Sequence, residues 1–166
     1  MVNGLANLPQ VVLGPLAGRP EEDWYAAPAG KWSAAQIVQH LALALDYSSR
    51  TFAARRAHAP MRRRRRTLRQ IVSYLMVFRV GWVPGRWRAP ELSRPAAHPA
   101  PAEVERQFRE GLDRLAGVAR ELLPGRGADL FVKHPVLGDL TLPEWLRFHD
   151  WHCAHHARQI RARLAR

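Results

Sequence analysis

The sequence predicts an all-α fold in a single domain that spans residues 1–166. Apolar residues recur at helical intervals along most of the chain, and no segment shows the alternating apolar residues of a half-buried strand. Two of the expected helices also begin with the same capping signal, a hydroxyl residue followed three positions later by Gln or Glu. A chain of 166 residues is long enough to bury one core.

The first two expected helices differ in how clearly they are bounded. Residues 5–16 have helical spacing, but two prolines interrupt the pattern. The second helix starts at a capping box formed by Ser33 and Gln36 and continues to about His58. His40 lies on its apolar stripe, so we expect this imidazole to face the core.

A shorter helix and a third long one follow. Residues 68–78 have apolar positions on one side of a helix, whereas the proline-rich residues 84–101 predict a long irregular connection. Residues 104–122 again place apolar side chains at helical intervals. Pro124 and Gly125 are expected to end that helix.

The last helix repeats the start signal of the second. Thr141 and Glu144 form its capping box. The second and fourth long helices should be neighbours, so that their stripes face each other. One stripe of this last helix is mostly polar and consists of Trp145, His149, His152, His156, Gln159 and Arg163.

The net charge of +12 is concentrated in one part of the chain. Residues 50–94 hold thirteen arginines against one acid, Glu91, and include the run Arg62–Arg66. This pattern is typical of contact with nucleic acid or an anionic membrane, and equally of a solvated basic surface. The basic and then apolar stretch Arg62–Val83 also suggests peripheral membrane attachment.

Cysteine content and hydropathy favour a cytoplasmic protein. Cys153 is the single cysteine, which excludes an internal disulfide and a zinc site made of cysteines alone. Residues 1–5 lack the basic leader of a secretory signal. The apolar run Ile71–Val83 is too short to span a bilayer.

The histidines of the last helix predict a metal centre. His152 and His156 are four residues apart, which places both imidazoles on one helix face about 6 Å apart along the axis. His40 is the obvious third ligand, and three protein ligands would leave one position open for water or substrate. Neutral imidazoles suit one divalent ion, most often zinc or nickel. Surface pairs with this spacing are the alternative.

Other polar residues of this helix have secondary roles in the prediction. His149 can line the pocket mouth and accept a proton, or simply pack. Gln159 can hydrogen-bond a ligand imidazole from behind. His155 is expected at the rim, and Cys153 faces away from the ligand stripe. Structural or exposed positions are expected for the remaining histidines, His58, His98 and His134.

Two motifs of the sequence are informative when taken together. The first is GKWSAAQIVQHL at residues 30–41. The second is HPVLGDLTLPEW at residues 134–145, which leads into HCAHHARQ at residues 152–159. Together they resemble the DinB/YfiT-like metal-binding four-helix bundles, in an uncharacterised branch. Many relatives read HHRGQ where residues 155–159 of this chain read HHARQ, so a common glycine is missing, and the ligand positions are untouched.

The resemblance implies a bundle of up-down-down-up topology, with an extra helix and a long crossover between the second and third bundle helices. The family's metal triad corresponds to His40, His152 and His156. Related members include transferases and isomerases that use a low-molecular-weight thiol, and dimers are common among them. A homodimer is therefore expected.

The leading functional hypothesis is a metal-dependent transferase or hydrolase that acts on a small molecule. A thiol-dependent reaction is one form of this hypothesis. In this hypothesis some of the arginines between Arg62 and Arg88 would lie at the pocket mouth and hold an anionic substrate or thiol cofactor. The alternative is a non-catalytic metal-binding protein, or one that binds nucleic acid or an anionic surface through residues 50–94.

Overall fold

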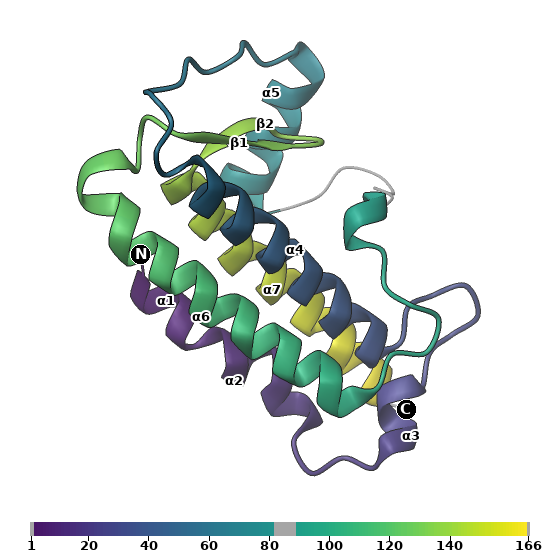
Figure 1. Ribbon diagram of the computed structural model, residues 1–166. Helices are drawn as coiled ribbons and strands as arrows, with labels where there is room; N and C mark the ends of the chain where they lie inside the picture. The colour runs from purple at the N-terminus through teal and green to yellow at the C-terminus, as the bar shows by residue number, and fades with distance from the viewer. Residues whose placement is uncertain (1, 82–88, 166) are drawn as a thin grey trace.

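Four helical segments pack side by side in the computed structural model, which describes residues 2–81 and 89–165 (Figure 1). The first segment is a broken helix, and the other three are long and continuous. The four segments are α1 (Val2–Ala6) with α2 (Leu8–Leu13) and the 3-10 turn η1 (Gly14–Leu16), then α4 (Ala34–Arg55), α6 (Pro101–Arg126) and α7 (Leu142–Leu164).

The segments run up, down, down and up. Helices α4 and α6 point the same way, and the first segment and α7 point the opposite way (Figure 1). Two parallel neighbours need a long connection, and the chain between α4 and α6 supplies it. The predicted all-α bundle topology is confirmed.

Both predicted capping boxes are present and fix where the ligand-bearing helices start. The backbone N–H of Gln36 donates to Ser33 Oγ at 3.3 Å, and the Ser33 N–H donates to Gln36 Oε1 at 3.0 Å. The Glu144 N–H donates to Thr141 Oγ1 at 3.3 Å, and the Thr141 N–H donates to Glu144 Oε2 at 2.7 Å. Such local signals involve neighbouring residues only, so they can be recognised from sequence.

Three helix ends differ from the prediction. Helix α4 ends at Arg55 instead of about His58, and α6 continues to Arg126 through the exposed Pro124. The expected helix 68–78 divides into α5 (Leu68–Leu75) and a π-helical turn η2 (Met76–Val80). Helix ends depend on tertiary contacts and on solvent access to the last carbonyls, which a periodic pattern does not encode.

A short antiparallel hairpin, for which the sequence shows no strand pattern, precedes α7. Strands β1 (Phe131–His134) and β2 (Gly138–Thr141) pair with Phe131 opposite Thr141. Each strand has only four residues, too few for alternation to become visible in the sequence. The Trp145 indole N–H donates to the Val132 carbonyl at 3.0 Å, which holds the hairpin against the start of α7.

Helices α4 and α6 approach each other closely in the core. Gly111 on α6 is buried, and a Cβ added there would lie 3.1 Å from Leu45 Cβ. The absent side chain therefore allows the two backbones to pack tightly. The largest fully buried side chains around this contact and through the core are Phe52, Phe108, Leu8, Leu16, Ile37, Leu41, Leu45, Leu115, Leu130, Leu137, Leu140 and Leu142.

The predicted crossover lies partly outside the described residues, which resume at residue 89. Its described part contains the 3-10 turn η3 (Glu91–Ser93) and is tied to one face of α4. Gln36 Nε2 donates to the Ala96 carbonyl at 3.1 Å, and the Ala96 N–H donates to Gln39 Oε1 at 2.7 Å. The connection thus follows α4 up to the level of His40. A short helix, α3 (Glu21–Tyr25), precedes α4.

Candidate metal centre

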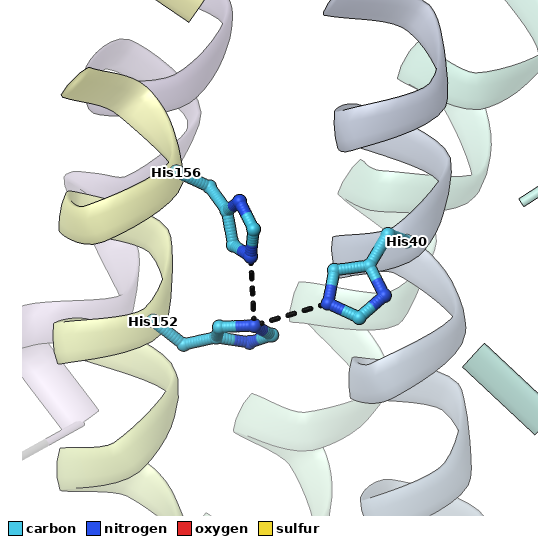
Figure 2. Close-up of side chains that lie close together, drawn as sticks. All are labelled: His40, His152 and His156. Atoms are coloured by element: carbon cyan, nitrogen blue, oxygen red, sulfur yellow. Dashed lines mark hydrogen bonds between the residues drawn. The ribbon is translucent and has the colours of Figure 1, made fainter. Parts of the chain in front are cut away.

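Three imidazoles from two helices converge in the bundle. Helix α7 carries His152 and His156, and the adjacent α4 carries His40 (Figure 2). His152 Nε2 lies 3.1 Å from His40 Nε2 and 3.1 Å from His156 Nε2. One ligand nitrogen from each residue lies within 4.8 Å of the other two. The predicted residues therefore meet.

The proton of His40 is fixed by the connection between α4 and α6. His40 Nδ1 lies 2.7 Å from the backbone carbonyl oxygen of Ser93. A carbonyl can only accept, so Nδ1 carries the hydrogen in the neutral ring. His40 Nε2 is then left with a lone pair that points at the other two imidazoles.

His156 is arranged in the same way by its own helix. Its Nδ1 lies 2.9 Å from Gln159 Oε1, and the amide nitrogen of Gln159 lies 3.1 Å from His155 Nε2. In this orientation of the amide, His156 Nδ1 donates to Gln159. His156 Nε2 is therefore a second lone pair aimed at the same point.

The hydrogen-bonding capacity of His152 cannot satisfy both neighbours. Neutral His152 has one N–H, so its Nε2 can donate to His40 or to His156 but not to both. A cation would satisfy all three nitrogens at once. Two nitrogens bound to a tetrahedral ion at about 2.0–2.1 Å are roughly 3.3 Å apart, close to the separations seen here.

Burial keeps these three rings neutral. It lowers the pKa of His40, an effect that the Ser93 carbonyl partly offsets. It lowers the pKa of His156 to about 3, with the neighbouring His40 and His155 contributing, and it takes the pKa of His152 well below its ordinary value. A metal binds the neutral imidazole, so low pKa values favour loading at neutral pH.

The ring of His152 is positioned by packing. Its Nδ1 is buried and has no hydrogen-bond partner among the described residues. The imidazole stacks on Phe148 with ring centroids 4.9 Å apart and planes at 27°. Metal-bound histidines usually donate their second N–H to a fixed acceptor. His152 differs from this pattern, because an aromatic ring supports it instead.

The centre is enclosed but not sealed. His40, His152 and His156 retain 6%, 9% and 8% of their surface exposed. Trp32, whose ring centroid is 5.0 Å from that of His40, covers part of one side. An ion held by three imidazoles in this position would be largely shielded from solvent.

Comparison with protein families matches residues 5–160 to the DinB superfamily. The chain belongs to the DinB superfamily. The match includes all three converging histidines, and it confirms the resemblance based on the two motifs. Neither the curated proteins nor the solved structures gave a match.

His149 of this DinB-superfamily chain lies within the bundle core and is only 1% exposed. Its Nε2 is 2.8 Å from the buried Ser48 Oγ, and its ring packs against Trp145 with centroids 5.4 Å apart. Burial, with a smaller contribution from nearby His134, lowers the pKa of His149 to about 3. These contacts favour the packing role over that of a proton acceptor at the pocket mouth.

Two further residues of α7 take the expected positions. His155 is half-buried at the rim, where it stacks on Trp151 with centroids 5.3 Å apart. Cys153 is buried, and burial raises the pKa of its thiol, with Asp150 adding to the effect. This thiol is therefore protonated and shielded from solvent.

Three arginines of the basic run are bound far from the histidines. Arg64 pairs with the buried carboxylate of Asp139, while Arg63 and Arg66 pair with Glu144. Glu144 precedes His152 by eight residues, about 12 Å along a helix. These three arginines therefore do not lie at the metal centre, where some of the arginines between Arg62 and Arg88 were expected. Arg86 and Arg88 lie outside the described residues.

Two contacts between distant parts of the chain, one of them at the metal centre, have no signal in the sequence. Ser93 supplies a backbone carbonyl, for which the side chain at position 93 gives no signal. Asp139 and Arg64 are 75 residues apart, and no local pattern links them.

Of the described helices, none combines the length and apolar character needed to cross a membrane.

Proposed function

We propose that this protein is a metal-dependent enzyme, a transferase or hydrolase, that acts on a small molecule. The observation that carries the proposal is the convergence of three Nε2 atoms. Hydrogen bonds from Nδ1 to Ser93 and Gln159 leave the Nε2 atoms of His40 and His156 unprotonated, with their lone pairs free to bind a metal. The DinB superfamily is metal-binding, which supports the same assignment. His40, His152 and His156 would hold one divalent ion, zinc or nickel.

Each residue of the centre has a separable task. His40 and His156 present lone pairs, His152 completes the set of three ligands, and Gln159 fixes the ring of His156. When bound, the ion would act as a Lewis acid and lower the pKa of a water or thiol ligand in the open fourth position. The half-buried Trp32 excludes bulk water from one side of the centre.

A thiol nucleophile would have to come from a small molecule. Cys153 is the single cysteine of the chain and is buried with a raised pKa. A low-molecular-weight thiol is therefore the cosubstrate we propose for a transferase reaction. Without such a thiol, activated water would make the protein a hydrolase.

Metal content tests the first part of the proposal. Elemental analysis of protein purified without chelator or His-tag should find about one divalent ion per chain. His152→Ala and His156→Ala should each lose most of it, whereas His58→Ala, which changes an exposed histidine, should retain it. Full occupancy in a His40→Ala/His152→Ala/His156→Ala variant would contradict the proposed site.

Spectroscopy tests the open position independently of any substrate. Protein loaded with Co²⁺ should show ligand-field bands of a low-coordinate ion, and added low-molecular-weight thiol should introduce a sulfur-to-cobalt charge-transfer band. A spectrum that no thiol, cyanide or azide changes would show that the position is closed and the metal structural. The non-catalytic alternative would then replace the enzyme.

The proposed oligomer is a homodimer, as is common among related proteins. Analytical ultracentrifugation tests it, since a dimer of this 18.9 kDa chain would have twice the monomer mass.

The alternative role in nucleic-acid binding needs free arginines. Three of the five in Arg62–Arg66 are already paired with acids.

A further inference from the structure

We propose that the outer face of α5 docks on an anionic lipid bilayer. The face consists of Leu68, Ile71, Val72 and Leu75, which are 83%, 42%, 57% and 47% exposed. Large aliphatic side chains exposed together on one helix mark an interaction surface. The inference does not depend on the metal centre.

The sequence of α5 separates the two sides of the helix completely. Positions 68, 71, 72 and 75 follow the i, i+3, i+4, i+7 spacing of one helical face, and in this helix that face is turned outward. The opposite side carries the buried Ser73 and the half-buried Tyr74, whose hydroxyl donates to Glu144 Oε1 at 2.9 Å. The polar contacts thus anchor α5 to the bundle, and the apolar side is left uncovered.

Three exposed arginines lie on α5 or in the segment that leads into it. Arg69 lies on α5 next to Leu68, and Arg62 and Arg65 lie in the segment that leads into the helix. All three are exposed. Long arginine side chains beside an apolar strip can keep their guanidinium groups at the level of lipid phosphates while the strip enters the acyl boundary.

The nearest acids do not cancel this charge. Asp139 and Glu144 already form ion pairs with Arg63, Arg64 and Arg66, in the segment that leads into α5. Residues 50–94 contain one further acid, Glu91, in η3 on the crossover. The surface around α5 is therefore basic, complementary to an anionic leaflet.

Charge also selects among possible occupants. A second copy of the chain, joined through the same face by two-fold symmetry, would bring these arginines against their equivalents. Nucleic acid would match the charge, but phosphate contacts leave four exposed aliphatic side chains without a role. A bilayer that contains anionic phospholipid matches both the charge and the apolar strip.

Vesicle flotation tests the proposal with matched variants. The full chain should float with vesicles of phosphatidylcholine and phosphatidylglycerol at low salt, and not with phosphatidylcholine alone. Leu68→Gln should weaken binding by about tenfold, since it removes one inserted side chain. Leu92→Gln, which changes an equally exposed leucine (73%) on η3, should bind like wild type.

The charge requirement is tested separately. Arg62→Gln/Arg65→Gln/Arg69→Gln should weaken binding by roughly 100-fold, at about fivefold for each arginine near the surface. The control Arg120→Gln/Arg158→Gln/Arg161→Gln removes three exposed arginines on α6 and α7 and should bind within a fewfold of wild type. Unchanged circular dichroism shows that each variant is folded.

Insertion can be observed directly because Cys153 is buried. In Leu68→Cys, an environment-sensitive dye on the new thiol should shift to the blue with anionic vesicles. No wild-type flotation would overturn the proposal. So would equal binding by Leu68→Gln, or a wild-type dimer that Leu68→Gln dissociates. Salt-sensitive binding of duplex DNA that depends on the same three arginines, without vesicle binding, would assign the surface to nucleic acid.

Discussion

Gln159 accepts a hydrogen bond from Nδ1 of the ligand His156, so the effect of replacing Gln159 on metal affinity can be predicted. Gln159→Leu removes the acceptor at 2.9 Å from His156 Nδ1 and releases the tautomer of that ring. Metal affinity should fall about 10–100-fold, as is usual for partners that orient a ligand. Competition with a chromophoric chelator measures it. Gln107→Leu, which changes a glutamine bonded to Glu103 on α6, is the control and should leave affinity unchanged.

His134 predicts a pH dependence of stability that is separate from the metal. Burial lowers its pKa to about 3 from an ordinary 6.5, and its Nδ1 accepts the N–H groups of Val136 and Leu137 at 3.2 and 3.1 Å. The unfolded chain therefore binds the proton first, so the stabilising effect is complete above pH 6.5 and is lost as pH falls toward 3. Between pH 7.5 and 5.0 the loss should be about 2 kcal/mol.

A substitution isolates this contribution. His134→Asn keeps an acceptor for the two backbone N–H groups and removes the titration, so its unfolding free energy should depend less on pH than that of wild type. Urea unfolding at both pH values, without metal, provides the measurement. His58→Asn, an exposed position, should behave like wild type. Equal slopes for wild type and His134→Asn would show that another group dominates.

At the scale of elements, the segment before α5 is attached to the hairpin by one buried carboxylate. Asp139 accepts the Arg64 backbone N–H at 3.0 Å and its Nε–H at 2.8 Å, and the Arg64 guanidinium lowers the pKa of that carboxyl. Asp139→Asn should destabilise the fold by about 1–2 kcal/mol, because it weakens charged hydrogen bonds in a largely buried place.

The loss should be local. Hydrogen exchange should accelerate in residues 62–67 and in β2, while the centre of α6 stays protected. Asp113→Asn, at an exposed position on α6, should leave both stability and exchange unchanged. Uniform acceleration over the whole chain would indicate global unfolding instead of release of this segment.

The elements that sequence analysis found are those determined by near neighbours. Ser33 with Gln36, and Thr141 with Glu144, are three residues apart, and His152 with His156 four, so their spacing alone carries the information. The position of His40 followed from its place on an apolar stripe. The hairpin, the Ser93 carbonyl and the Arg64–Asp139 pair depend on residues brought together by folding. No local pattern in the sequence encodes them.

At the scale of the molecule, a bound ion would join α4 to α7 and stabilise the folded state. A ligand present at about 100 times its dissociation constant adds about 2.7 kcal/mol, or roughly 5–10 °C in Tm for a chain of this size. Chelation should lower Tm by that amount in wild type. The His40→Ala/His152→Ala/His156→Ala variant should be insensitive to chelator, and a similar fall in both would point to an ion elsewhere.

The hydrogen bonds that fix the tautomers of His40 and His156 differ in how easily a substitution can remove them. Gln159 acts through its side chain, so most single substitutions at that codon would free His156. Ser93 acts through its carbonyl, which every amino acid provides, so a change of side chain at position 93 leaves the bond to His40 chemically intact. In a saturation screen that measures metal content, substitutions at position 159 should therefore lower the content, whereas substitutions at position 93 should not. Deletions in the crossover should lower it as well, because the bond to His40 depends on the length and path of the main chain.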